Sequence, residues 1–206
     1  TCALPISTNE QYNADGSYGG LCTKFIWTNG ETTGGSGIKL RGNGALIEDI
    51  QLLGRPFEED FTGEGPASGT KLRSGIEVEG RASPATGSNV INRCTIAEFE
   101  YGIHCRRGYD LDEFDVFVVD ENHADTTSVN DTYFWSCNSC FRSENQQAVK
   151  WSLNNCRVSG FGGRGAIDDM IVADIWRGGD IDIKGLTIDY PRVTIFNVRD
   201  YSPHNS

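Results

Sequence analysis

The sequence is poor in methionine, in proline and in extended apolar segments. Met occurs once and Pro six times in 206 residues. A transmembrane helix needs about 20 consecutive, mostly apolar residues to cross the hydrocarbon layer. Polar residues interrupt every apolar segment of this chain well before that length. We therefore expect no membrane insertion.

Clusters of basic residues are also missing. The formal net charge is -11, and the longest basic run is the pair Arg106-Arg107. Nucleic-acid binding relies on grouped Lys and Arg side chains that neutralise phosphates. The composition therefore argues against a nucleic-acid partner and fits neutral saccharides, proteins or divalent cations better. A simpler interpretation, in which the charge only keeps an extended β protein soluble, stays open.

Apolar residues recur in two short patterns. The pattern apolar-x-x-apolar-x-apolar occurs four times, beginning at Ile47, Ile91, Leu153 and Ile183. The second pattern is a small residue followed by a β-branched residue and then by alternating polar and apolar residues. It begins at Gly37, Gly75, Gly102 and Ala148. Such repetition without helical periodicity is typical of a β-solenoid whose repeats carry loops of variable length. The sequence predicts an all-β fold, a parallel β-helix with long loop insertions.

Stacked repeats place equivalent residues in columns, with neighbouring strands about 4.8 Å apart. We expect two inward columns, one of Leu40, Val78, Cys105 and Trp151 and one of Ile50, Cys94, Cys156 and Leu186. We expect two outward columns, one of Lys39, Glu77, His104 and Lys150 and one of Arg41, Glu79, Arg106 and Ser152. Opposite charges alternate down the outward columns, which indicates a cross-strand ladder and favours the ionised forms of Glu77 and Glu79.

One long segment repeats without a gap. Residues 91–103 align with residues 183–195, which predicts a strand, a corner and a next strand of equal length in both copies. Residues 165–183 admit two registers, with either Ile167 or Ile181 on the column of Ile38. The second register keeps Ile183 inside and is preferred.

Three of the seven cysteines are interpreted as core residues, and Cys2 and Cys22 could pair if the protein lies outside a cell. Because Cys94, Cys105 and Cys156 occupy apolar positions of the repeats, we expect buried free thiols. We also expect one repeat to lie between Cys94 and Cys156 and keep them apart. Cys137 and Cys140 form a lone C-x-x-C without the second pair or the histidines that a zinc site needs. We therefore expect no cofactor.

The chain divides into two predicted parts. Residues 1–20 are polar and Gly-rich and are interpreted as an N-terminal cap or linker, and residues 21–206 as the β-helix. Long loops are expected at 54–74 and 108–130, projecting from one end of the cross-section as a ligand or subunit surface. The second loop contains the apolar run 114–119, which should be covered. A strand predicted at 193–198 lies close to the last residue, so we expect a fragment of a longer chain.

Three segments carry a resemblance to a known family. Lys24–Thr28, Ser36–Leu40 and Ile47–Gly54 resemble the first turns of pectate-lyase-like right-handed β-helices, most of all those of phage tailspikes and tail fibres. The resemblance spans roughly residues 21–200. It implies a right-handed helix and a virion or extracellular homotrimer that contacts other virion proteins and recognises a host surface polysaccharide.

Two alternatives to this function remain open. One is a polysaccharide-degrading enzyme on the same scaffold, and the other is a purely structural virion protein. The calcium and arginine constellation of pectate lyases is not recognisable, which favours a glycoside hydrolase over a lyase.

Candidate site residues follow from this chemistry. Glycoside hydrolysis needs two carboxylates about 5 to 9.5 Å apart, and the catalytic candidates are Asp115, Asp120, Asp168, Asp169 and Glu77. Aromatic side chains can stack on sugars, and the candidates for ligand binding are Tyr101, Tyr109, Trp135 and Trp176. Hard cations bind carboxylate oxygens, and the candidate metal ligands are Asp110, Asp112 and Asp115. A solvated loop is the simpler interpretation of these last residues.

Overall fold

The computed structural model describes residues 4–7, 23–26, 36–40, 42–54, 74–79, 86–106, 124–145, 148–159, 170–189 and 193–198. Every regular element within these ranges is a β-strand. The same ranges contain no helix long and apolar enough to span a membrane. The predicted all-β class is therefore confirmed for the described part of the chain.

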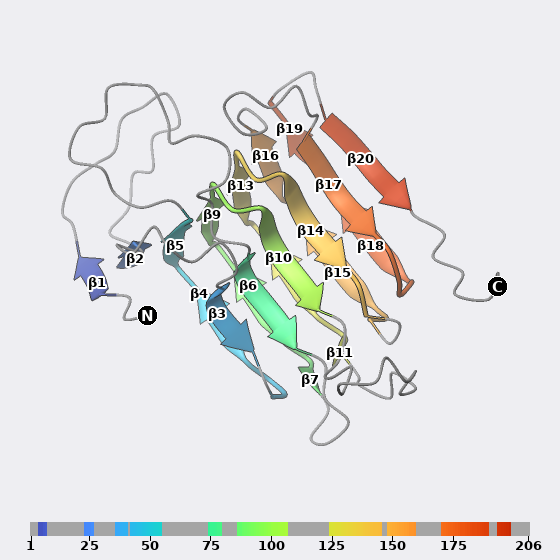
Figure 1. The fold of residues 1–206 in the computed structure, drawn as a ribbon, viewed down its shortest axis with the longest axis horizontal. Coiled ribbons are helices and arrows are strands. Elements are labelled where there is room, and N and C mark those ends of the chain that lie inside the picture. The colour runs from blue at the N-terminus through green and yellow to red at the C-terminus, as the bar shows by residue number, and fades with distance from the viewer. Residues whose placement is uncertain are drawn as a thin grey trace, which may run out of the picture.

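Most strands belong to three sheets (Figure 1). The six-stranded sheet contains β3 (Ser36–Leu40), β6 (Ser74–Glu79), β10 (Tyr101–Arg106), β14 (Ser139–Ser143), β17 (Met170–Ile175) and β20 (Val193–Val198). The five-stranded sheet contains β4 (Leu46–Glu48), β8 (Val90–Asn92), β12 (Ser128–Asn130), β15 (Trp151–Asn154) and β18 (Ile181–Lys184). The seven-stranded sheet contains β1 (Leu4–Ser7), β2 (Thr23–Ile26), β5 (Ile50–Leu53), β9 (Thr95–Ala97), β13 (Tyr133–Trp135), β16 (Arg157–Ser159) and β19 (Thr187–Ile188).

The chain visits the three sheets in a fixed rotation. After a strand of the six-stranded sheet comes one of the five-stranded and then one of the seven-stranded sheet, as in β10, β12 and β13. Neighbouring strands in each sheet are parallel, except that β1 is antiparallel to β2. A small additional pair, β7 (Thr86–Gly87) with β11 (Ala124–Asp125), is also parallel. Parallel strands in stacked sheets, shown in Figure 1, are compatible with a β-helix or solenoid.

Corners between the five-stranded and seven-stranded sheets are made by single residues with positive φ. These residues are Asp49, Arg93, Asp131, Asn155 and Gly185. A left-handed conformation costs a non-glycine residue about 1 to 2 kcal/mol. Four of these corners, all except that of Gly185, donate a backbone hydrogen bond to the next repeat. The N–H of Asp131, for example, donates to the carbonyl of Asn154 at 2.9 Å, and that of Asn155 to the carbonyl of Lys184 at 2.7 Å.

The small residues of the second sequence pattern are explained by packing in the six-stranded sheet. Two successive residues of these strands are buried, as Gly102 and Ile103 are in β10. A Cβ at Gly102 would lie 2.8 Å from the Phe134 ring, and a Cβ at Gly75 would lie 2.7 Å from a methyl group of Ile96. Both distances are too short for a side chain, so glycine is required where the sheet approaches the core this closely.

The predicted inward column of Ile50, Cys94, Cys156 and Leu186 is confirmed, with one addition. The strand registers place Thr132 between Cys94 and Cys156. The intervening repeat that we expected is therefore present. Cys94, Cys105 and Cys156 are buried free thiols, as predicted.

The fourth member of the other inward column was predicted wrongly. Cys105 pairs with Ser143 of β14, not with Trp151. Trp151 is buried, but it lies in β15 of the five-stranded sheet and donates its indole N–H to the carbonyl of Ala124 at 2.8 Å. For the same reason Lys150 and Ser152 do not belong to the outward columns of Glu77 and Glu79, although Lys150 is exposed as expected. The pattern at Ala148 has the right composition but belongs to a different sheet.

Two further register predictions need correction. Ile103 shares its column with Phe141, Ala173 and Phe196, so the alignment of residues 91–103 with 183–195 slips by one residue at its end. The connection from β19 to β20 is one residue longer than that from β9 to β10, and such a slip exchanges the two faces of a strand. Ile183 lies on the inward column of Leu153 as expected, but Ile181 pairs with Trp151.

The predicted loop at 108–130 is too long. Strands β11 and β12 occupy residues 124–125 and 128–130. The apolar run 114–119 and most of the loop predicted at 54–74 lie outside the described residues.

Candidate functional site

One polar column crosses the outer face of the six-stranded sheet. Its members, called the central ladder below, are Lys39, Glu77, His104, Arg142, Asp174 and Asn197. Three of these six, namely Lys39, Glu77 and His104, were predicted for this column. Although the face points away from the core, Glu77, His104, Arg142 and Asp174 are at most 4% exposed. Charges buried this deeply must be paired and hydrogen-bonded to be tolerated.

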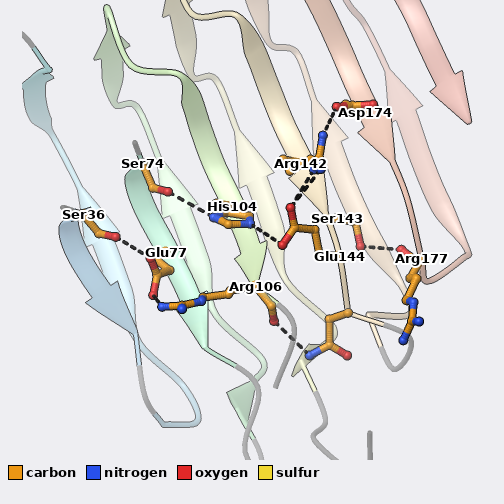
Figure 2. Close-up of polar contacts among 11 residues, drawn as sticks. Ser36, Ser74, Glu77, His104, Arg106, Arg142, Ser143, Glu144, Asp174 and Arg177 are labelled. Carbon is orange, nitrogen blue, oxygen red and sulfur yellow. Dashed lines mark hydrogen bonds and ion pairs between the residues drawn. The ribbon is translucent and has the colours of Figure 1, made fainter. Parts of the chain in front are cut away.

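Glu77 is held by three neighbours (Figure 2). Ser36 donates a hydrogen bond to one carboxylate oxygen. The other oxygen lies 3.4 Å from Nζ of Lys39 and 3.5 Å from Nη1 of Arg106. Burial alone would raise the pKa of Glu77, but the Ser36 hydrogen bond and the charges of its neighbours outweigh burial and lower it. Glu77 is therefore a buried anion.

His104 links two repeats of the sheet. Its Nδ1 lies 3.1 Å from Oγ of Ser74, and its Nε2 lies 3.3 Å from a carboxylate oxygen of Glu144. Ser74 and Ser36 share one column, so each serine contacts the ladder residue of the following repeat. Burial opposes ionisation of Glu144, but the contacts with His104 and Arg142 dominate and lower its pKa to about 2.

Arg142 makes the largest number of described contacts in the ladder. Its Nη1 donates to Asp174, and its Nε and Nη2 donate to Glu144 at 3.1 and 2.9 Å. Asp174 also accepts a hydrogen bond from the Asn197 amide at 2.8 Å. Figure 2 shows Arg142 between the two carboxylates. Both of its charged partners therefore come from neighbouring positions of the same face.

Two aromatic rings lie against this ion network. The guanidinium carbon of Arg142 is 3.7 Å from the ring centre of Trp176 and 5.2 Å from that of Tyr101. Tyr101 is also 4.9 Å from the His104 ring, at 55°. Both aromatic side chains are half-buried. A guanidinium over an aromatic face is attracted by the ring quadrupole, so the positions of the two rings depend on Arg142.

The aromatic candidates do not all meet at this site. Tyr101 and Trp176 lie together on the six-stranded sheet, as just described. Trp135 lies in β13 of the seven-stranded sheet, beside Ala97 and Ser159, so it belongs to another face. Tyr109 lies outside the described residues.

The arrangement favours binding over acid catalysis. A glycosidase general acid must hold its proton near neutral pH, and its pKa is usually raised by an apolar site. Glu77 has the opposite electrostatic environment, because the Ser36 hydrogen bond and two cations lower its pKa even though its side chain is only 3% exposed. Within the described ranges, no three His, Cys, Asp or Glu side chains are placed to hold a metal ion together.

The remaining predicted site residues lie outside the described residues. They are Asp110, Asp112, Asp115, Asp120, Asp168 and Asp169. The prediction missed the ladder members Arg142, Asp174 and Asn197 and three residues that contact the ladder, Glu144, Ser36 and Ser74. The signal that would have found Arg142 is Cys140-Phe141, a degenerate copy of Gly102-Ile103. The predicted repeat instead has Ala148-Val149 at that place.

No protein-family model, curated protein or solved structure matches this chain.

Proposed function

We propose that this chain is the β-solenoid of a virion-associated attachment protein, tailspike-like or fibre-like, that binds a host surface glycan. The binding surface is the outer face of the six-stranded sheet around Tyr101 and Trp176. The observation that carries this proposal is the contact of both rings with one buried arginine. Rings fixed before binding lose little conformational entropy when a ligand arrives.

The chemistry of the face suits a sugar. A pyranose presents an apolar C–H face, which stacks on an aromatic ring, and hydroxyl groups, which need hydrogen-bonding partners. Partly exposed polar groups lie on the same face: Glu144, which contacts Arg142, has a side-chain exposure of 21%, and Arg106, which contacts Glu77, has one of 44%. Rings and polar groups therefore occur on one rigid sheet.

The proposed scaffold is a closed, right-handed solenoid. Two observations support closure. The chain passes through the three sheets in the same order in every repeat, and each corner between the five-stranded and seven-stranded sheets has one residue with positive φ. Parallel strands of one sheet that are joined by a crossover are right-handed in about 98% of cases. The proposal also includes identical subunits, as a homotrimer, and other virion proteins as partners.

Glycan binding is tested by screening the assembled protein on an array of bacterial and animal surface polysaccharides. We expect binding to at least one class, lost in Trp176→Ala and kept in Trp135→Ala, a matched change on the seven-stranded sheet. Equal loss in both variants, with circular dichroism unchanged, would place the binding surface elsewhere. A release of reducing ends from the bound polysaccharide would favour the alternative of a glycoside hydrolase.

A purely structural role in the virion is the second candidate. Ile195, Phe196 and Val198 of β20 are 44, 49 and 70% exposed, although they continue columns that are buried in the preceding repeats. An uncovered apolar strand edge favours contact with another polypeptide. The test is sedimentation of the parent and of Phe196→Ser with Val198→Ser. An assembly that breaks down in the double variant, without any glycan binding in the parent, supports the structural role.

A further inference from the structure

We infer that the face around Trp176 selects uncharged saccharides, with Arg142 acting as a positioning residue for the rings and not as an anion receptor. This inference rests on the proposed glycan binding and adds the chemical class of the ligand. It is carried by the balance of charges on the face and by the burial of Arg142.

The ionic groups of the face neutralise one another. Each described cation of the ladder and of the column beside it contacts a carboxylate. The pairs are Lys39–Glu77, Arg106–Glu77, Arg142–Glu144 and Arg142–Asp174. These contacts join three cations to three carboxylates, Glu77, Glu144 and Asp174. Arg177, on the turn after Trp176, also takes part in an interaction. An incoming carboxylate or sulfate would therefore find cations that are already paired.

Arg142 is the least suited of these cations to receive an anion. Its side chain is 5% exposed, and that of its partner Asp174 is 3% exposed. An anionic sugar would have to displace a buried carboxylate from the guanidinium, and breaking such a pair leaves an uncompensated charge in a poorly solvated place. The contacts that remain on offer are the half-buried rings of Trp176 and Tyr101, which suit the C–H face of a neutral sugar.

Long-range electrostatics act in the same direction. The whole chain has a formal net charge of -11. A net negative protein repels polyanionic chains before contact and slows their association, most of all at low ionic strength. Neutral polysaccharides do not experience this repulsion. Both the local pairing and the overall charge therefore disfavour uronic acids, sialic acids and sulfated sugars.

The ligand class is tested with matched oligosaccharides. We would measure binding of neutral hexose oligomers (cello-, malto- and galacto-oligosaccharides) and of two anionic ones, oligogalacturonate and oligosialic acid, to the assembled protein at low and high salt. We expect binding only to a neutral member, with a Kd that salt changes little. Tighter binding of an anionic member, weakened by salt, overturns the selection of uncharged sugars and leaves glycan binding standing. Binding of no saccharide on this panel or on a broad array overturns the proposed function itself.

The positioning role is tested with variants that separate charge from stacking. Arg142→Lys keeps the positive charge but loses the planar group that lies on the ring. We expect the tryptophan fluorescence of Trp176, isolated as the difference between the parent and Trp176→Phe, to change in Arg142→Lys. We expect affinity for the neutral oligomer to fall about tenfold, the scale of one aromatic contact.

Two variants keep this test independent of folding. Trp176→Phe retains an aromatic face and should bind better than Trp176→Ala. Arg157→Lys makes the same exchange on the seven-stranded sheet, where the guanidinium carbon of Arg157 is 5.2 Å from the ring centre of Tyr133, and should leave binding to the neutral sugar unchanged. Unchanged affinity and fluorescence in Arg142→Lys, or a large loss of neutral-sugar affinity in Arg157→Lys, would overturn the role given to Arg142.

Discussion

Arg142 lies between a carboxylate and an aromatic ring, with Nη1 on Asp174 and its guanidinium carbon 3.7 Å from the centre of the Trp176 ring. The ion pair and the ring contact use different surfaces of one planar group, the edge and the face. Any change that rotates Arg142 away from Asp174 therefore also alters the contact of its guanidinium with the Trp176 ring. The stability of this sheet and the geometry of its outer face are linked through a single side chain.

The first prediction compares a buried with an exposed ion pair in the same protein. Asp174→Ala leaves Arg142 buried without its partner, which typically costs about 3 to 5 kcal/mol. Asp182→Ala removes the partner of Lys184, but both side chains of that pair are at least 51% exposed. Exposed pairs contribute about 1 kcal/mol or less. Urea unfolding of the two variants measures the difference.

Asp174→Asn separates the loss of the negative charge from the loss of the side chain, because it keeps the shape of the side chain and its hydrogen bond with Asn197. We expect it to be destabilised less than Asp174→Ala but more than Asp182→Ala. Equal unfolding free energies for all three variants would mean that the Arg142–Asp174 pair contributes no more than a surface pair.

The second prediction concerns acid stability. The pKa of Glu144 is lowered from 4.5 to about 2, by contacts with His104 and Arg142 that outweigh burial. Because the folded pKa lies below the unfolded one, Glu144 contributes stability above pH 4.5 and loses it as the pH falls towards 2. Glu144→Gln should be less stable than the parent near neutral pH and should depend less on pH across this window.

The measurement is the urea midpoint of both proteins at a series of pH values through this window. Glu48→Gln is the control, because Glu48 is 42% exposed and its contact with Arg93 is screened by solvent. Parallel pH curves for the parent and Glu144→Gln would contradict the prediction.

The strand class, the column of Ile50, Cys94, Cys156 and Leu186, and the first members of the columns in the six-stranded sheet could be predicted because they depend on local pattern. Gly75-Ile76-Glu77 and Gly102-Ile103-His104 have the same spacing and the same inward and outward alternation, so the sequence alone places Glu77 beside His104. The next copy reads Cys140-Phe141-Arg142. In this copy cysteine replaces glycine and phenylalanine replaces isoleucine. Which side-chain volumes fit at these two positions depends on tertiary packing, and the local pattern does not specify it.

The buried state of the ladder could not be predicted for a different reason. Alternation correctly assigns Glu77 and His104 to the outer face, which usually means solvent. Their burial depends on Ser36, Ser74 and Glu144, which come from other strands and turns. Such contacts form only when repeats that are distant in the sequence stack on one another. The spacing of residues within one repeat therefore does not predict them.

The third prediction concerns another residue with positive φ, at the start of a strand of the five-stranded sheet. Lys150 is exposed and has φ of 57°, at the entry to β15. A lysine in this conformation is strained, and a β-branched residue more so, whereas glycine is not. Lys150→Gly should be neutral or stabilising, and Lys150→Val should cost about 1 to 2 kcal/mol. Ser152→Gly within β15 is the matched control and should destabilise, since glycine weakens a strand interior. A higher Tm for Lys150→Val than for Lys150→Gly in thermal unfolding would reject the backbone argument.

The fourth prediction concerns the buried thiols. Cys94, Cys105, Cys137, Cys140 and Cys156 are free and buried. Burial raises the pKa of Cys156 to about 11 and that of Cys105 further, so little thiolate is present at mildly alkaline pH. Because the thiolate is the nucleophile, all five should react slowly with a disulfide reagent in the folded protein and rapidly after unfolding.

The control is a thiol introduced at an exposed position of the same fold. Leu46 is 60% exposed in β4, so Leu46→Cys should react at once in the folded protein. Thr132 lies between Cys94 and Cys156 in their column, and two strand spacings of about 4.8 Å exceed the Cα separation that a disulfide allows. Mass spectrometry without reductant should therefore find no peptide that joins these two cysteines. Finding that link would mean that the registers of β9, β13 and β16 are wrong.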